Sequence, residues 1–128
     1  MKLLIDTCVF LWWVDNPAKL SQDCRRLCAD PDNAIYLSAV SAWEIALKYA
    51  LGRLTLSDTP DRYVPRYRAL HDIDTLDVSE DDTLHLIRLP NLHRDPFDRM
   101  LVCQAVARGL TVVTPDPLIT QYPIRTIW

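Results

Sequence analysis

A chain of 128 residues is long enough for one domain with a substantial core, and no change of composition indicates a second, so we expect a single domain over 1–128. Fourteen basic side chains against seventeen acidic ones leave a net charge of −3. That balance alone does not indicate a nucleic-acid partner, which more often meets a basic surface. Only two glycines are present, which excludes glycine-rich phosphate and dinucleotide loops.

No segment has the pattern of a signal peptide or a membrane span. Only three apolar residues separate Lys2 from Asp6, and the longest apolar run, residues 8–14, is too short to cross a bilayer. The four cysteines show no disulfide framework, so we expect a reducing, cytoplasmic setting and no membrane partner. Cys24 and Cys28 lie one helical turn apart, and we interpret them as small apolar residues of a helix face rather than a metal site.

Short apolar runs alternate with helical patterns along the chain. In chain order we expect a strand at 2–6, a helix starting at 7, a helix at 21–30, a strand at 34–38, a helix at 41–54, a loop leading into an irregular helix at 55–66, a strand at 73–78, helices at 79–89 and 95–109, a strand at 111–114 and a short fifth strand at 124–127. Continuously apolar strands that alternate with helices indicate an α/β fold. We expect a mostly parallel central sheet of four to five strands with helices on both faces.

Capping residues mark the ends of several expected helices. Ser21 and Ser41 are expected N-caps, and Gly52 is expected to end the helix that Ser41 begins. Asp95 precedes a proline, which suits the first helical position, and Gly109 is expected to end that helix. These boundaries place acidic residues near the starts of helices.

Acidic residues also flank the predicted strands at the edge where parallel α/β sheets bind ligands. Glu44 has a structural alternative, because Ser41 and Glu44 have the spacing of a capping box and Lys48 lies four residues further on. Asp95 is the best cap in the chain, whereas Asp98 has less structural reason to be acidic. The pattern by itself favours a structural role for Glu44 and leaves a second role open for Asp98.

Two further acids complete the set. Asp6 ends a buried strand, where a charge is costly unless it is paired or bound to a metal, and Asp116 follows the strand at 111–114, where a turn is an alternative role. Carboxylates gathered at one sheet edge repel one another, and a divalent cation that prefers oxygen relieves this repulsion. Because no histidine or cysteine occupies these positions, zinc is disfavoured and Mg²⁺ is favoured, an ion that usually acts on phosphates and can activate water.

Four segments together carry a family resemblance. They are LLIDTCVFLWW (3–13), SAVSAWEIALKYALGRL (38–54), HRDPFDRMLVCQAVARGLTVVTPD (93–116) and the terminal YPIRTIW (122–128). In this order, and over nearly the whole chain, they resemble the PIN-domain ribonucleases, most of all the VapC toxins of type II toxin–antitoxin systems. The resemblance implies a Mg²⁺- or Mn²⁺-dependent endoribonuclease that hydrolyses phosphodiester bonds of structured RNA. It also implies a homodimer that a small cognate antitoxin neutralises.

The resemblance assigns roles residue by residue. The four acids that it implies to be catalytic are Asp6, Glu44, Asp98 and Asp116. Of these, Asp6, Asp98 and Asp116 are the implied metal ligands, with Asp95 beside Asp98 as an alternative third ligand. The implied supporting residues are Thr7, Asp95 and Thr114. Cys8 departs from the histidine of many relatives, and the substrate-binding residues stay unassigned.

The residues leave several alternatives open. A PIN-like domain can instead bind RNA or protein without cleaving it, although the four acidic positions are intact here. Contact with phosphates and plain solvation are equal alternatives for six arginines, Arg53, Arg62, Arg66, Arg68, Arg94 and Arg99. Surface or packing roles are expected for the three histidines, His71, His85 and His93.

The antitoxin is expected to meet the acidic site directly. An arginine or lysine from its C-terminal segment would satisfy the carboxylates in place of the metal ion. The aromatic residues Phe10, Trp12 and Trp13 are expected to line an apolar groove for the rest of that segment.

Overall fold

Five parallel strands form the centre of the protein in the computed structural model, which describes residues 1–128. They are β1 (Lys2–Ile5), β2 (Ala34–Ser38), β3 (Asp74–Leu76), β4 (Thr111–Val113) and β5 (Thr126–Ile127). Their order across the sheet is β3-β2-β1-β4-β5, and every neighbouring pair is parallel. The predicted α/β class and the parallel central sheet are confirmed.

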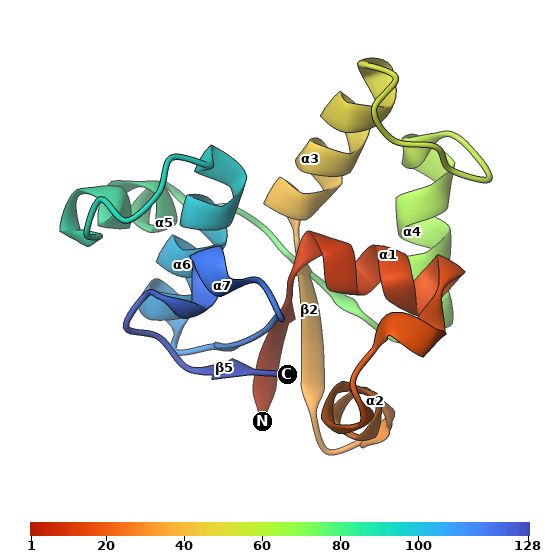
Figure 1. The fold of residues 1–128 in the computed structure, drawn as a ribbon, viewed down its shortest axis with the longest axis horizontal. Helices are drawn as coiled ribbons and strands as arrows, with labels where there is room; N and C mark the ends of the chain where they lie inside the picture. The colour runs from red at the N-terminus through yellow and green to blue at the C-terminus, as the bar shows by residue number, and fades with distance from the viewer.

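Seven α-helices connect and cover the strands (Figure 1). They are α1 (Thr7–Asp15), α2 (Gln22–Ala29), α3 (Ala39–Ala50), α4 (Pro60–Leu70), α5 (Glu80–Leu84), α6 (Pro96–Arg108) and α7 (Pro117–Thr120). Two short 3₁₀ helices, Pro17–Lys19 and His85–Arg88, follow α1 and α5. None of the helices combines the length and the apolar character that a membrane span requires.

The two faces of the sheet bury separate apolar cores. Successive side chains of a strand point to opposite faces, so Leu3 and Ile5 of β1 lie in one core and Leu4 lies in the other. The first core is completed mainly by α1, α2 and α4, and the second mainly by α6 and α7. Figure 1 shows the same division, with these two groups of helices on opposite sides of the strands. Helices on both faces are therefore confirmed.

Helix α6 has the ends that the sequence predicts. The Asp95 Oδ1 atom accepts the backbone N–H groups of Phe97 and Asp98 at 2.9 and 3.2 Å, and Pro96 occupies the first turn. Gly109 ends the helix with a φ of +65°, a conformation that glycine adopts without steric cost. The cap fixes where α6 starts, and with it the position of Asp98 in the first turn.

Helix α3 starts earlier than predicted. The hydroxyl of Ser38, not that of Ser41, accepts an N–H group at the helix start, from Val40 at 3.0 Å, so the helix begins at Ala39. Ser41 is fully buried inside the helix, and its hydroxyl lies 2.8 Å from that of Thr7. The sequence pattern conceals this cap because Ser38 is also the last residue of the apolar strand β2.

Three other local features differ from the prediction. The irregular helix expected after the loop at 55–66 is the continuous helix α4, which contains Pro65 and extends to Leu70. The one-turn helix α7, which Asp116 caps, was not predicted, because four residues carry no periodicity. Phe10 does not line a surface groove: it is fully buried, with its ring 6.3 Å from that of Tyr63.

A buried carboxylate fastens α5 to α6 on the second face of the sheet. Asp82 is 1% exposed and accepts hydrogen bonds from the Ser79 N–H at 2.9 Å, from Arg108 at 2.8 Å and from Gln104 at 3.4 Å. Burial by itself would raise the pKa of Asp82. The hydrogen bonds from Arg108, the Ser79 N–H and Gln104 outweigh burial and lower this pKa to about 2.

We expect Asp82→Asn to destabilise the protein at neutral pH. A carboxyl group whose pKa is lowered by folding stabilises the protein above pH 3.8, and this contribution is lost as the pH falls toward 2. The difference corresponds to roughly 2 kcal/mol of unfolding free energy at pH 7. Chemical denaturation should show a loss of that size at pH 7 that shrinks toward pH 3. Asp81→Asn is the control, because the Asp81 side chain is 80% exposed.

Candidate active site

The carboxyl ends of β1, β2 and β4 meet at one edge of the sheet. The strand order reverses between β1 and β4, which is the place where open parallel sheets bind ligands. A pocket of about 410 Å³ lies there. The charged side chains that line it are Asp6, Glu44, Asp95, Asp98, Asp116, Lys48 and Arg53. The structure thus brings together all five acids that the sequence placed at this edge.

Asp6 connects the end of β1 to the start of α1. Its Oδ1 atom accepts the Thr7 N–H at 2.7 Å and caps the helix, while its Oδ2 atom accepts the Thr114 hydroxyl at 2.8 Å. Burial raises the pKa of Asp6; hydrogen bonds from Thr114, Cys8 and the Thr7 N–H oppose the rise, and the charge of Glu44 adds to it. Neutral donors rather than a cation therefore hold this carboxylate in place.

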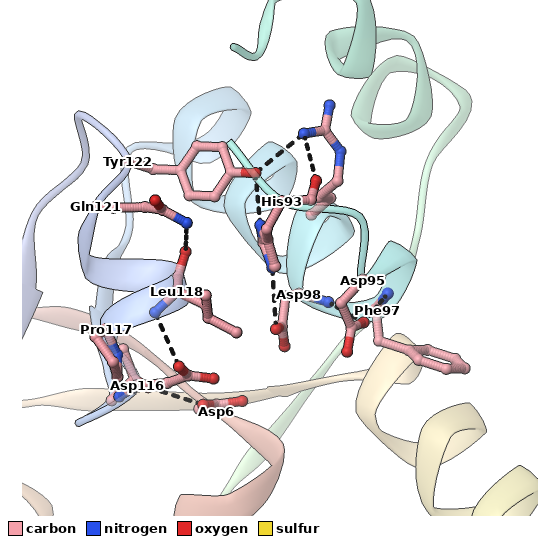
Figure 2. Close-up of polar contacts among 12 residues, drawn as sticks. Asp6, His93, Asp95, Phe97, Asp98, Asp116, Pro117, Leu118, Gln121 and Tyr122 are labelled. Atoms are coloured by element: carbon pink, nitrogen blue, oxygen red, sulfur yellow. Dashed lines mark hydrogen bonds and ion pairs between the residues drawn. The ribbon is translucent and has the colours of Figure 1, made fainter. Parts of the chain in front are cut away.

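Thr114 joins Asp116 to Asp6. Its hydroxyl donates to Asp6 and accepts the N–H of Asp116 at 3.0 Å. The Asp116 Oδ1 atom accepts the Leu118 N–H at 2.9 Å and so caps α7. Figure 2 shows the bond between Asp116 and Leu118, with the carboxylates of Asp6 and Asp116 close to each other. The geometry gives a reason for the supporting role expected of Thr114, because one hydroxyl orients groups from both ends of the chain.

Glu44 enters the pocket from α3. It is 6% exposed, and one carboxylate oxygen accepts from the Lys48 ammonium group, as the spacing predicts. The hydrogen bond to Glu44 raises the pKa of Lys48. The capping-box alternative for Glu44 is wrong, because Ser41 is not the N-cap. The Ser41 hydroxyl instead bonds that of Thr7 and ties α3 to α1, which positions Glu44 beside the other acids.

Asp95 and Asp98 have different environments. Asp95 is half-buried and uses one oxygen as the cap of α6. Asp98 is 8% exposed, and its Oδ2 atom lies 3.2 Å from the Nε2 atom of His93. Burial raises the pKa of Asp98 to about 6; the charges of Asp95, Asp6 and Asp116 act in the same direction, and the hydrogen bond from His93 opposes them.

His93 is a site residue that the sequence analysis missed, since it was expected to have a surface or packing role. Its side chain is 9% exposed, and its Nδ1 and Nε2 atoms bond Tyr122 and Asp98. Arg99 is not a free phosphate contact, because it is buried and donates to Tyr122 and to the carbonyl of Pro90. No spacing signal could have found this cluster, because Tyr122 lies 29 residues beyond His93.

Cys8 and Arg53 also line the pocket. The Cys8 thiol donates to the Oδ2 atom of Asp6 at 3.4 Å. Burial and the charge of Asp6 raise the pKa of Cys8 far above its ordinary value, so the thiol stays protonated at neutral pH in the metal-free protein. Of the six arginines left open by the sequence, only Arg53 lines this pocket. All four cysteines are free thiols.

The donor set of the pocket fits a hard divalent cation. Five carboxylates face two cationic side chains, so an excess of negative charge is left for an ion to neutralise. Mg²⁺ and Mn²⁺ prefer oxygen ligands, whereas zinc prefers nitrogen and sulfur. No three histidine, cysteine, aspartate or glutamate side chains lie close enough together to ligate one ion directly. Mg²⁺ keeps several waters, so it needs only one or two direct carboxylates.

Comparison with known sequences establishes the family of the chain. The PIN-domain family matches residues 3–124, so the protein belongs to the PIN-domain family. Among curated proteins, Ribonuclease VapC16 of Mycobacterium tuberculosis is 38% identical over 63 residues, which are 49% of this chain and 45% of that protein. The chain thus matches less than half the length of this curated relative.

Solved structures confirm the PIN-like fold. VapBC2 from Rickettsia felis, bound to a DNA fragment from its promoter, contains a chain that matches with a TM-score of 0.75 at 16% identity, covering 99% of this chain and 98% of that one. FitAcB from Neisseria gonorrhoeae matches with a TM-score of 0.63 at 19% identity, over 98% and 96% of the two chains. VapBC-5 from Mycobacterium tuberculosis matches with a TM-score of 0.55 at 21% identity, over 94% and 89%.

We expect Asp98→Asn to stabilise the metal-free protein at neutral pH. Folding raises the pKa of Asp98 from 3.8 to about 6, so the ionised group costs free energy once the pH has risen through this range. The amide removes this cost and should add about 1–3 kcal/mol to the free energy of unfolding at pH 7.5. The gain in stability should vanish below about pH 4, where Asp98 becomes protonated in both the folded and the unfolded protein.

Chemical denaturation of both proteins in chelator at pH 7.5 and pH 4 measures this difference. Asp95→Asn is the matched control and should change stability little, because asparagine caps helices about as well as aspartate. A lower stability of Asp98→Asn at pH 7.5 would mean that the charge of Asp98 is structural.

Proposed function

We propose that this protein is a metal-dependent endoribonuclease that hydrolyses phosphodiester bonds of structured RNA, and that it is the toxin of a type II toxin–antitoxin pair. The convergence of Asp6, Glu44, Asp98 and Asp116 on one pocket carries the proposal. Membership of the PIN-domain family and the similarity to a relative named as a ribonuclease support it. The four free thiols support work in the reducing cytoplasm.

We assign Asp6, Asp98 and Asp116 as the residues that would hold Mg²⁺ or Mn²⁺, directly or through waters of the ion. When bound, such an ion supplies a Lewis acid that neutralises charge on the phosphate and activates water. Thr114 orients Asp6 relative to Asp116, and the Thr7 N–H fixes the second oxygen of Asp6. These neutral donors leave the charge of the carboxylates uncompensated, so it remains available to the ion.

The remaining polar residues of the pocket suit the substrate. Lys48 and Arg53 are its two cationic side chains, and we assign them to phosphates of the RNA on either side of the scissile bond. Glu44 holds Lys48 at the pocket by their ion pair and adds a carboxylate that can orient the attacking water. The arginines at 62, 66, 68 and 94 do not line this pocket and receive no role.

A cleavage assay with purified protein and structured RNA tests the proposal. Wild type should cleave with Mg²⁺ or Mn²⁺ and stop in excess EDTA. Asp98→Asn should lower the cleavage rate by roughly a hundredfold or more, the scale of losing one group that stabilises charge in the transition state. Asp95→Asn should remain active, because the amide preserves the cap of α6.

The outcomes of this assay separate the alternatives. If wild type cleaves RNA specifically and at an undiminished rate in chelator, the metal mechanism is contradicted. Binding of RNA without cleavage, at saturating Mg²⁺ and Mn²⁺, would identify a non-catalytic binding module instead. An inactive Asp95→Asn beside an active Asp98→Asn would reverse the assignment of cap and ligand. Circular dichroism of both variants controls for loss of the fold.

We further propose two protein partners, a second copy of the chain and a small cognate antitoxin. The large side chains of Trp43, Leu47 and Leu51 are exposed and follow one another at intervals of four residues. They form an apolar stripe along α3 and its C-cap, which supports self-association. The antitoxin proposal is supported by solved structures of similar fold that belong to VapBC toxin–antitoxin systems. The excess negative charge of the pocket favours a basic side chain as its inhibitory contact.

An antitoxin that acts by charge should depend on a basic residue in its C-terminal segment. We expect such an arginine or lysine to lie against Asp6, Asp98 or Asp116, so substituting it by Gln or Met should restore cleavage in the presence of antitoxin. Co-purification with the product of the neighbouring gene, followed by the cleavage assay, measures this. Full inhibition by an antitoxin segment without any arginine or lysine would show that blocking is purely steric.

A further inference from the structure

Four side chains form a continuous hydrogen-bonded chain that reaches Asp98 from the side opposite Asp6 and Asp116 (Figure 2). The Arg99 Nη1 atom lies 3.0 Å from the Tyr122 hydroxyl, which lies 2.8 Å from Nδ1 of His93. The Nε2 atom of His93 lies 3.2 Å from Oδ2 of Asp98. The chain joins the segment before α6, the first turn of α6 and the segment after α7.

The ionised carboxylate of Asp98 fixes the direction of this hydrogen-bonded chain, because it can only accept a hydrogen bond. A guanidinium group can only donate, so the Tyr122 oxygen accepts from Arg99. The hydroxyl hydrogen of Tyr122 then has Nδ1 of His93 as its acceptor. The ring hydrogen of a neutral His93 therefore sits on Nε2 and is donated to the Asp98 carboxylate. The Tyr122 hydroxyl, oriented by Arg99, thus matches the tautomer that donates to Asp98.

Burial makes this arrangement rigid. Arg99 is 9% and Tyr122 is 2% exposed, and the side chains of His93 and Asp98 are 9% and 11% exposed. Arg99 also donates to the carbonyls of Pro90 and His93 at 3.1 and 3.2 Å. The rings of His93 and Tyr122 pack edge to face, with centroids 5.4 Å apart. Breaking buried hydrogen bonds of this kind leaves polar groups without partners and is costly.

We propose that Tyr122 and His93 are positioning residues that hold Asp98 ready for a divalent cation. His93 engages only Oδ2 of Asp98, which leaves Oδ1 for the pocket, where Asp6 and Asp116 face it. Partners that orient a metal ligand through a hydrogen bond are commonly worth 10–100-fold in metal affinity. The inference rests on the proposed metal-binding role of Asp98.

The alternative is that Tyr122 and His93 only stabilise the fold. Removal of the Tyr122 hydroxyl distinguishes this structural role from the positioning role. Arg99 keeps two carbonyl partners without this hydroxyl, so the packing around α6 does not depend on it. The bond to Asp98 does depend on it, because without the donor at Nδ1 the His93 ring loses the side-chain partner that holds its orientation. Asp98 would then lose its partner and could turn toward Lys48, which lines the same pocket.

The test is the binding of Mn²⁺ alone, measured by isothermal titration calorimetry without RNA. Tyr122→Phe removes one oxygen and keeps the ring, and we expect it to weaken Mn²⁺ binding about tenfold. His93→Ala should weaken it at least as much, and His93→Gln, which keeps an N–H donor, should recover part of the loss. Tyr67→Phe is the matched control, because Tyr67 packs on Tyr63 outside this cluster, and it should bind Mn²⁺ as wild type does.

Nitrogen-15 NMR of the metal-free protein gives a second readout. Wild-type neutral His93 should carry its hydrogen on Nε2, and Tyr122→Phe should weaken this preference. Wild-type His93 with its hydrogen on Nδ1, or Tyr122→Phe with wild-type Mn²⁺ affinity, would overturn the positioning role. A lower melting temperature together with unchanged Mn²⁺ affinity would overturn it as well and leave a structural role.

The results of these measurements distinguish a failure of the positioning role from a failure of the proposed function. If wild type binds Mn²⁺ and the variants bind it more weakly, but wild type cleaves no RNA, the proposed nuclease activity is overturned and the positioning role stands. Metal-dependent cleavage by wild type, with Mn²⁺ affinity unchanged in Tyr122→Phe and His93→Ala, would overturn the positioning role alone. A wild type that binds no Mn²⁺ would overturn both.

Discussion

The parallel pairing of β1 with β2 on one side and with β4 on the other is the constraint on which the site depends. It places the carboxyl ends of these strands at one edge, so that Asp6 and Thr114 lie within hydrogen-bond distance although 108 positions separate them in the sequence. The helices that start at or beside this edge deliver Glu44, Asp98 and Asp116 to the same pocket. A shift of one residue in either pairing would turn Leu4 and Ile5 to the wrong faces and Asp6 away from its partners.

Two buried carboxylates of this protein, those of Asp82 and Asp98, have pKa values that are shifted in opposite directions. Asp82 has Arg108 as a partner, and its lowered pKa means that the charge stabilises the fold. Asp98 has burial and three like charges around it, and its raised pKa means that the ionised group costs free energy. The Thr7 N–H and the Thr114 hydroxyl orient Asp6, and His93 orients Asp98. The metal site that we propose needs this combination of ordered carboxylates and excess negative charge, which costs stability in the metal-free protein.

The C-terminal segment contributes to the site as well as adding β5 to the sheet. Tyr122 lies between α7 and β5 and reaches the cluster behind Asp98, while Asp116 at the start of α7 reaches the pocket itself. Both ends of α7 are therefore connected to acids of the site. A helix of four residues has little stability of its own, so these connections and the burial of Ile119 hold it in place.

The sequence by itself determined the α/β class, five strands in their correct order along the chain, the cap of α6 and the five acids at one edge. Each of these follows from local properties, apolar runs, capping chemistry and the geometry of parallel sheets, that a pattern of letters preserves. Only the tertiary structure decided that Ser38 rather than Ser41 starts α3, that Phe10 is core, and that His93, Tyr122 and Arg99 stand behind Asp98. These facts depend on which side chains meet across long separations in sequence, and burial and hydrogen bonding choose those partners only once the chain is folded.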